Sequence, residues 1–206
     1  LVEAINQMES PPELLINASA IGFYGDRGIK EMGEDSPPGT GFLADVCSEW
    51  EKTALKADSE KVRVVIARIG VVLTPAGGML KKLLPPFLSG LGGKIGTGEQ
   101  FISWIAIDDL LEAMEFIIHH PELAGPVNLT APKPCTNEQF TEVLGKTIHR
   151  PTIFPMPEAA ARAAFGEMAE DTMLSSTRVI PERLMLAGYN YRYPTIDRAL
   201  KYLFGQ

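Results

Sequence analysis

Apolar residues gather in short runs along this chain, and the most informative run lies between Leu14 and Asp26. The sequence LLINASAIGFYGD passes from apolar into small residues and is then interrupted by Gly22 and Gly25. This pattern is typical of a buried parallel strand that ends in a loop. Because ligands of open α/β sheets lie outside the carboxyl ends of the strands, the small residues predict room for a ligand there.

A helix and a second strand are predicted directly after this loop. From Phe42 to Ala57, apolar side chains recur every three to four residues, as in an amphipathic helix; they are Leu43, Val46, Trp50 and Ala54. The β-branched run from Val62 to Leu73 predicts another buried strand. A strand, a helix and a strand in this order form a right-handed crossover between parallel strands.

Further elements are expected between residues 77 and 120. An apolar helix follows a glycine pair and is expected to be broken by Pro85 and Pro86. The segment from Gln100 to Ile107 predicts a strand. Asp108 is well placed to cap the next helix, which is expected to end at His119.

The order of these elements predicts an α/β fold. Parallel strands are expected near Glu13–Ala20, Val62–Ile69 and Pro126–Leu129. A smaller mixed domain is expected from about Pro75 to Gln100 and from Ala131 onward. In this domain Thr136 or Asn137 would cap a helix, and the tail would form short helices between prolines around a tyrosine-rich turn.

The composition favours a globular protein that does not bind nucleic acid. The 206 residues include 26 acidic and 19 basic side chains, and the net charge of -7 would repel a phosphate backbone. No apolar run approaches the roughly 20 residues of a membrane span. Cys47 and Cys135 lie far apart without the spacing of metal ligands, so we expect free thiols, no metal site and a cytoplasmic or other reducing location.

Two glycine-rich segments are better explained as connections than as phosphate loops. Gly22, Gly25 and Gly28 follow a strand, but the polar segment behind them cannot start the helix that would hold a pyrophosphate. The segment SGLGGKIGTG lacks the upstream glycine of a P-loop, and its Lys94 is followed by Ile95.

The histidines and a pair of adjacent acids favour structural roles over catalytic ones. His119 and His120 lie at an expected helix end, where a cation suits the helix dipole, and His149 precedes an Arg-Pro turn. Asp108 and Asp109 have the appearance of a catalytic carboxylate pair, but helix capping explains them more simply.

Several longer motifs follow one another as they do in a known enzyme family. The segments are SAIGFYGD, GEDSPP, ARIGVVLTPAGGML, GTGEQFISWIAIDDLLEA and GPVNLTAPKPCTNEQF. Their order resembles the second half of extended and atypical short-chain dehydrogenases/reductases. Among these, the chain is most similar to the nucleoside-diphosphate-sugar epimerase-like proteins of the NAD-dependent epimerase/dehydratase family, which carry their own carboxyl-terminal module.

The resemblance covers nearly the whole chain and implies its domains. Residues 1–74 and 101–130 would form the second half of a doubly wound Rossmann sheet that binds NAD(P). Residues 75–100 and 131–206 would form a smaller mixed α/β substrate or capping module. Since the chain opens on Leu1 and a buried parallel strand needs neighbours on both sides, we expect the carboxyl-terminal two-thirds of a longer protein. About a hundred residues, with the true glycine loop, would precede Leu1.

The chain departs from the family in its catalytic pair. Family members use a Ser or Thr at the end of this strand and a YxxxK pair on the next helix, where the Lys lowers the pKa of the Tyr. No tyrosine in this chain is followed by a lysine four residues later. The hydroxyl position falls on Ala20, beside Ser19, and the Tyr and Lys positions fall near Leu43 and Cys47. Atypical family members commonly lack the pair.

The resemblance implies an NAD(P)-dependent oxidoreductase or epimerase that acts on a small carbonyl or sugar substrate, nucleotide-linked or free, with NADP slightly favoured over NAD. The nicotinamide end would lie against Ser19, Ala20, Gly70 and Val71. The substrate cleft would be lined by Phe23, Tyr24, Gln100, Ser103 and Trp104, although core packing explains Phe23 and Trp104 about equally well. Ser19 and Tyr24 are the candidate catalytic residues, and Tyr24 is the only nearby phenol available for proton transfer.

A second hypothesis is that the scaffold has become a catalytically inactive NAD(P)-binding regulatory or interaction protein. The missing Tyr and Lys favour this hypothesis, whereas the polar and aromatic residues at the strand end favour an enzyme. The sequence is also compatible with a homodimer, because the unpaired backbone edge of the first strand would attract a partner.

Overall fold

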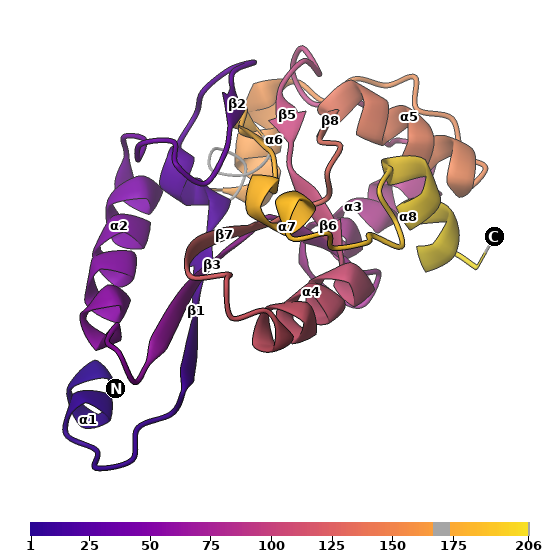
Figure 1. The fold of residues 1–206 in the computed structure, drawn as a ribbon. Coiled ribbons are helices and arrows are strands. Elements are labelled where there is room, and N and C mark those ends of the chain that lie inside the picture. Colours follow the sequence, from indigo (N-terminus) through magenta and orange to yellow (C-terminus); the bar gives the residue numbers. More distant parts are fainter. Residues whose placement is uncertain (167–173, 206) are drawn as a thin grey trace.

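The computed structural model describes residues 1–166 and 174–205, apart from the side chains of Ala164 and Phe165. Its central sheet contains β1 (Leu14–Ala20), β3 (Arg63–Ile69) and β7 (Gly125–Leu129), in the order β1-β3-β7. All of these strands are parallel, as predicted. Helices α2 (Phe42–Ala54) and α4 (Ile107–His119) lie on opposite sides of this sheet, which makes the predicted α/β layers (Figure 1).

The faces of the sheet are set by the alternation of side chains along β3. Val64 and Ile66 pack with Ala54 and Ala57, on the side of α2 and the short 3-10 helix η2 (Leu55–Ala57). Val65 and Ala67 point the other way and pack with the buried residues of α4. Because successive residues of a strand face opposite sides, an apolar run is buried on both. The first helix, α1 (Val2–Asn6), adds Ile5 to the α2 side.

Helix α2 buries a different stripe from the one predicted. The side chains that face the sheet are Ala44, Cys47, Glu51 and Ala54. Leu43 and Val46 are half-buried, and Trp50 is 57% exposed. The prediction was wrong about Trp50 because it ranked residues by hydrophobicity, whereas the buried stripe consists of three small residues and Glu51, which pairs with Arg68.

Each of two predicted strands is split in the structure. The run from Val62 to Leu73 is divided at Gly70 into β3 and β4 (Val71–Leu73). The run from Gln100 to Ile107 is divided at Ser103 into β5 (Phe101–Ile102) and β6 (Trp104–Ala106), and Ile107 already begins α4. Strand β4 pairs in parallel with β6, and β5 pairs antiparallel with β8 (Cys135–Thr136).

The split at Gly70 has a steric cause. A Cβ at this position would lie 2.7 Å from the carbonyl oxygen of Ser103, so only glycine permits this approach. The amide of Gly70 still bonds to Leu129 in the sheet, at 3.1 Å, whereas that of Val71 bonds to Ser103, at 2.8 Å. The chain therefore changes partner within one residue.

Two predictions about helix ends and breaks were wrong. Helix α3 (Gly78–Leu88) contains Pro85 and Pro86 in its second half and continues through them. Helix α4 is preceded by Ala106 without a side-chain cap, so Asp108 does not cap it. The structure does confirm Thr136 as the cap of α5 (Asn137–Thr147), in a capping box with Gln139.

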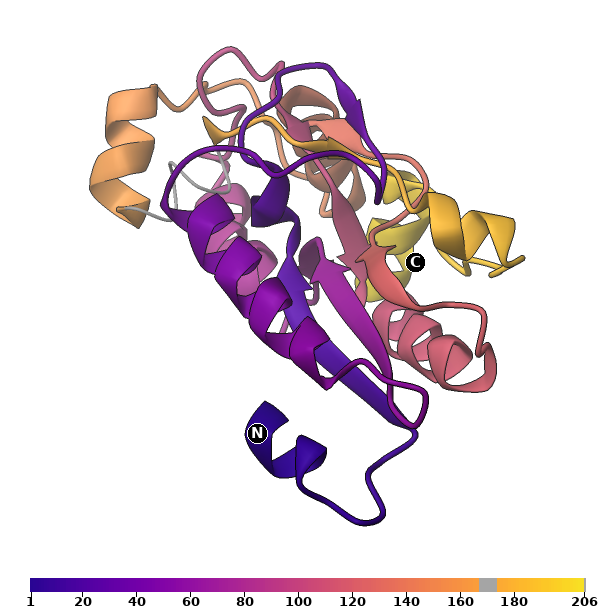
Figure 2. The ribbon, with the colours of Figure 1, turned by 60° about the vertical axis from the view of Figure 1, so that its left-hand side comes forward.

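The carboxyl-terminal part contributes short elements that lie above and beside the sheet in Figure 2. They are α6 (Glu158–Phe165), β9 (Arg178–Val179), α7 (Glu182–Leu186) and α8 (Ile196–Leu203), in agreement with the short helices predicted for the tail. Strand β9 pairs in parallel with β2 (Glu31–Met32), far away in sequence. Residues 167–173 of the predicted tail lie outside the described residues. None of the described helices is long and apolar enough to cross a membrane.

Candidate functional site

A cavity of about 710 Å³ opens at the carboxyl ends of β1 and β3. Its floor is formed by the strand ends and by the 3-10 helix η1 (Ile21–Tyr24), which directly follows β1. The first turns of α2 and α3, the β5 segment, α6 and residues 174–177 form the walls. The cavity therefore lies where the carboxyl ends of parallel strands were expected to leave room for a ligand.

The structure brings only part of the predicted site to this cavity. Ala20, Gly70, Val71 and Ser103 line it. Ser19, Phe23, Tyr24, Gln100 and Trp104 lie behind or beside the lining, and all of these except Gln100 are buried. Behind the lining, several of them belong to a polar network within the protein.

This network starts from a row of polar residues across the sheet. Ser19 of β1 is paired in register with Arg68 of β3, which is paired with Asn128 of β7. All have exposed fractions of 5% or less. Because neighbouring residues in register share a face, these side chains lie together one residue before the strand ends.

Arg68 is the centre of the network. Its guanidinium donates to both carboxylate oxygens of Glu51 on α2, with Nε 2.9 Å from Oε1 and Nη2 2.8 Å from Oε2. Its Cζ lies 3.6 Å from the centre of the Phe23 ring, in a cation-π contact. The hydroxyl of Ser19 donates to the same Oε1 of Glu51, at 2.7 Å. Arg68 therefore holds a strand, a helix and the η1 loop together.

Tyr24 is committed to this network. Its hydroxyl donates to Oδ1 of Asn128 at 2.7 Å and accepts from Nη1 of Arg68 at 2.8 Å. Burial raises the pKa of Tyr24, although the charge of Arg68 opposes this. The phenol therefore stays protonated, and its fully buried hydroxyl faces the sheet.

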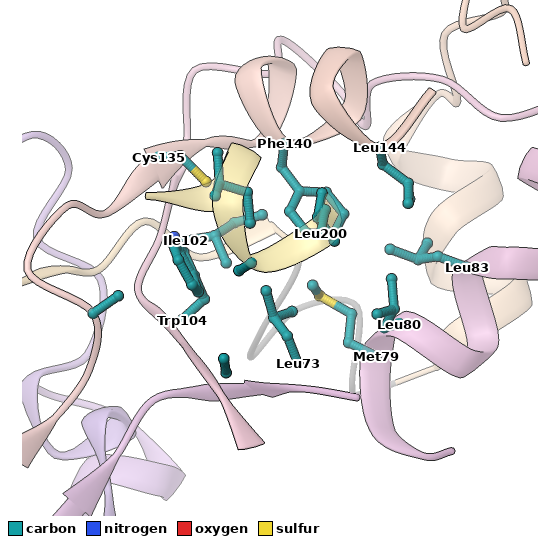
Figure 3. Close-up of a cluster of buried hydrophobic side chains, with 14 of the residues drawn as sticks. Leu73, Met79, Leu80, Leu83, Ile102, Trp104, Cys135, Phe140, Leu144 and Leu200 are labelled. Atoms are coloured by element: carbon teal, nitrogen blue, oxygen red, sulfur yellow. The ribbon is translucent and has the colours of Figure 1, made fainter. Parts of the chain in front are cut away.

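The remaining predicted residues have their partners within the protein. Ser103 is fully buried, and its hydroxyl donates to the Thr177 carbonyl and accepts from the Val179 amide, each at 2.8 Å. Gln100 donates to the carbonyl of Ile95 at 3.0 Å. Trp104 packs in the large apolar core of the carboxyl-terminal part (Figure 3). Of the two interpretations of this residue, core packing is therefore the one that the structure supports. Figure 3 places the Trp104 ring near Ile102, Cys135 and Leu200.

Few groups in the cavity can exchange protons. Among the described lining residues, the ionisable side chains are Asp26, Glu158 and Arg162. Glu158 and Arg162 form an ion pair with an N to O distance of 3.4 Å on α6. Apart from the fully buried Ser103, the described lining residues with hydroxyl groups are Thr40, Ser175 and Thr177. The lining is otherwise apolar or glycine, so it suits a largely uncharged ligand.

Sequence reasoning missed Arg68 and Glu51. Arg68 interrupts an otherwise apolar strand and Glu51 lies on the sheet side of its helix, so a buried ion pair could have been suspected from the charges alone. The lining residues from 174 to 177 left no comparable signal, because only the tertiary fold brings this segment to the strand ends.

Asp109 does not cap a helix but binds backbone amides of the tyrosine-rich segment. It is fully buried, and its carboxylate accepts from the amides of Arg192 and Tyr193 at 2.8 and 3.0 Å. Asp109 therefore fixes the tyrosine-rich segment to α4.

Glu34 allows a prediction about pH. Its Oε1 accepts from the amides of Asn128 and Arg183, whereas its buried Oε2 has no hydrogen-bond partner among the described residues. Burial raises the pKa of Glu34 above its ordinary value of 4.5. A carboxyl with a raised folded-state pKa stabilises the fold below its unfolded pKa and loses that contribution as the pH rises.

We therefore expect the free energy of unfolding of Glu34→Gln to fall less than that of the native chain as the pH rises from about 4.5. Urea unfolding at several pH values measures this difference, with Glu60→Gln as the control at an exposed position. Parallel pH profiles for Glu34→Gln and the native chain would contradict the prediction.

Comparison with known proteins gives the family context of this geometry. Residues 156–203 match a family described as a domain of unknown function, DUF1731. An epimerase family protein of Mycobacterium bovis is 47% identical over 91% of this chain and 62% of its own length. The human epimerase family protein SDR39U1 is 35% identical over 98% of this chain and 69% of its own length.

Solved structures agree with these relatives. The crystal structure of human SDR39U1 (isoform 2) with NADPH superposes with a TM-score of 0.93 at 33% identity, over 99% of this chain and 69% of that one. A nucleoside-diphosphate sugar epimerase from Corynebacterium glutamicum gives a TM-score of 0.81 at 35% identity, over 99% of this chain and 40% of that one.

The chain belongs to the epimerase family. It spans 62% of the length of the mycobacterial relative. The Rossmann-type α/β fold expected from the motifs is therefore confirmed.

The resemblance puts the family's Tyr and Lys near Leu43 and Cys47, and the structure shows the surroundings of both residues. Leu43 lies in the first turn of α2 and lines the cavity. Cys47, one turn later, is buried with Phe23, Tyr24 and Met32. The apolar side chain of Leu43 therefore lines the cavity at the position where the resemblance puts the family's tyrosine.

The glycines after β1 form turns, and His120 packs against an aromatic ring. Gly22 lies in η1, and Gly25 and Gly28 adopt positive φ angles of 63° and 57° in the turns that follow. His120 follows the end of α4, where its ring stacks on Phe116 at 3.5 Å.

Proposed function

We propose that this protein is an NAD(P)-dependent oxidoreductase or epimerase that holds the nicotinamide end of the cofactor in the cavity at the ends of β1 and β3. The observation that carries the proposal is the position of the cavity in a chain that superposes on human SDR39U1, which was crystallised with NADPH. The general rule for open α/β sheets gives independent support, because it puts the ligand at these strand ends.

The residues of the cavity suit this group. Ala20 and Gly70 present little or no side-chain bulk at the strand ends, so a flat ring can approach the backbone there, and Val71 adds an apolar side chain beside them. Ser19 does not line the cavity, and its hydroxyl is bonded to Glu51. The apolar wall formed by Ile21, Leu43 and Met79 would exclude water from the ring. The cofactor, when bound, supplies or accepts a hydride.

The substrate is a small carbonyl compound or sugar that shares this cavity. Reduction of a carbonyl also needs a proton. Because the Tyr24 hydroxyl is bonded to Asn128 and Arg68, it is not free to act as the donor, and the proton comes from a water molecule that enters the cavity with the substrate. This assignment replaces Tyr24 as the candidate acid.

Cofactor binding can be tested with a cavity-filling substitution. Ala20→Leu places extra carbon atoms against the expected ring position, and we expect it to weaken NADPH binding at least about tenfold while changing stability by less than about 2 kcal/mol. The measurement is calorimetric titration of NADPH into the protein at its natural length.

Ala124→Leu is the matched control. Ala124 is exposed and precedes β7 at the opposite end of the sheet, so the same side chain added there leaves the cavity unchanged. Equal NADPH affinity of the native protein and Ala20→Leu would contradict the proposed location. Absence of NADPH and NADH binding at high micromolar concentration would remove the proposed function itself.

One observation favours a second candidate, a regulatory protein that binds NAD(P) without turnover. Among the described residues, the lining has no Tyr, Lys or His side chain, which are the usual proton donors beside a nicotinamide. Isotope exchange separates the candidates. Washout of label from labelled NADPH in the presence of carbonyl compounds supports the enzyme, whereas bound and inert cofactor supports the regulator.

A further inference from the structure

We infer that the substrate of this cavity is an uncharged or weakly charged apolar carbonyl compound and not a nucleoside diphosphate sugar. The inference rests on the proposed function, because it concerns the substrate that would share the cavity with the cofactor. It is carried by the charged side chains in and around the cavity among the described residues, which do not match the charge of a diphosphate.

The ionisable groups of the lining are acidic in sum. Among the lining residues that the structure describes, Asp26 and Glu158 oppose a single base, Arg162, which is already paired with Glu158. A diphosphate carries at least two negative charges, and sites for such groups usually supply arginine or lysine to match them.

The guanidinium groups nearest the cavity are bonded to other parts of the protein. Arg27 donates to the carbonyls of Tyr24, Pro37 and Pro38. Arg68 is buried against Glu51. Arg178 is paired with Glu31, with an N to O distance of 2.7 Å. Turning Arg27 or Arg68 toward a ligand would break several hydrogen bonds, and turning Arg178 would break its ion pair and its contact with the Phe101 ring.

Two helix N-termini favour an anion in the cavity, but their partial charges are too small to balance a diphosphate. Helices α2 and α3 both begin at the cavity wall, after Gly41 and Gly77, without side-chain caps. Each N-terminus is equivalent to roughly half a positive charge. Together they offset the excess acid and leave no net positive charge for a diphosphate. They do leave a site with little net charge and apolar walls, which suits a neutral ligand.

Ligand-observed NMR on the protein at its natural length tests this inference. The probes are UDP-glucose, UDP and the uncharged bicyclic ketone 1-tetralone, each with and without saturating NADPH, so that the dinucleotide site is filled in one arm. We expect 1-tetralone to bind in both arms and UDP-glucose to show no binding tighter than about 1 mM in the NADPH arm.

Charge variants make the test specific. Glu158→Lys replaces a lining acid by a base, and we expect it to tighten UDP binding in the NADPH arm by about tenfold. Glu142→Lys makes the same change on the exposed face of α5, outside the cavity, and is expected to leave UDP binding unchanged.

Each outcome decides a separate point. UDP-glucose binding below about 100 µM to the native protein with NADPH bound would overturn the inference and leave the proposed function intact. Failure of 1-tetralone to bind in both arms would overturn the apolar part of the inference. Failure of NADPH to bind would instead remove the proposed function, and the probe results without cofactor would still decide the charge argument.

Discussion

Replacement of Arg68 with alanine is expected to lower the free energy of unfolding by about 3 to 5 kcal/mol. The loss arises because Glu51, which is 5% exposed, would keep a buried carboxylate without its cation. Ser19 and Tyr24 would remain, but neither supplies a charge to match it. Urea unfolding at neutral pH measures the change.

A double variant separates the cost of the unpaired charge from the value of the pair. Arg68→Met combined with Glu51→Leu replaces both charges with apolar side chains of similar size, and such replacements of buried pairs are often close to neutral. We therefore expect the double variant to be more stable than Arg68→Ala, with part of the loss remaining because the Tyr24 hydroxyl loses a donor. A cost below about 1 kcal/mol for Arg68→Ala would show that water reaches Glu51.

The parallel strands could be predicted because burial on both faces leaves a plain mark in the sequence. Most residues are apolar or small in the two runs that form these strands, Leu14 to Ala20 and Arg63 to Ile69. A glycine follows each run within two residues. The position of the cavity followed from the same pattern, since small residues at a strand end leave space.

The change of partner at Gly70 could not be read from the sequence. The apolar run continues through it, and only the approach of the Ser103 carbonyl explains why a new strand starts at Val71. Trp104 is a related case, because a large aromatic residue beside a strand end is equally suited to a cleft and to a core. The choice depends on Phe140 and Leu200, which come from distant helices.

The polar residues at the strand ends show a similar limit. The sequence indicates that Ser19 and Tyr24 lie near the end of β1, but it does not reveal which way their hydroxyls point. That direction depends on the register of Arg68 and Asn128 in two other strands, which is set by tertiary pairing. Residues near a site can therefore be predicted more reliably than residues that line it.

The loop that forms the cavity floor depends on the close approach of Gly39 to the segment after β1. The amide of Gly39 donates to the carbonyl of Phe23 at 2.8 Å. A Cβ on Gly39 would collide with the carbonyl oxygen of Tyr24 and lie 2.7 Å from the amide nitrogen of Gly25. These are backbone atoms, and the side chain of Tyr24 is fixed to Asn128. The loop therefore has little freedom to move away.

We expect Gly39→Ala to lower the free energy of unfolding by about 2 to 3 kcal/mol and to weaken NADPH binding, because the displaced loop carries Ile21 and Gly25 of the cavity. Urea unfolding and calorimetric titration of NADPH measure the two effects. Gly77→Ala is the matched control: Gly77 also precedes a helix at the cavity, but a Cβ there would meet no atom within 4 Å. Gly39 and Gly77 both have backbone angles that alanine adopts without strain, so a difference between the variants isolates the steric contact. Equal stability of the two variants would show that the loop after β1 yields easily, and the floor of the cavity would then not be rigid.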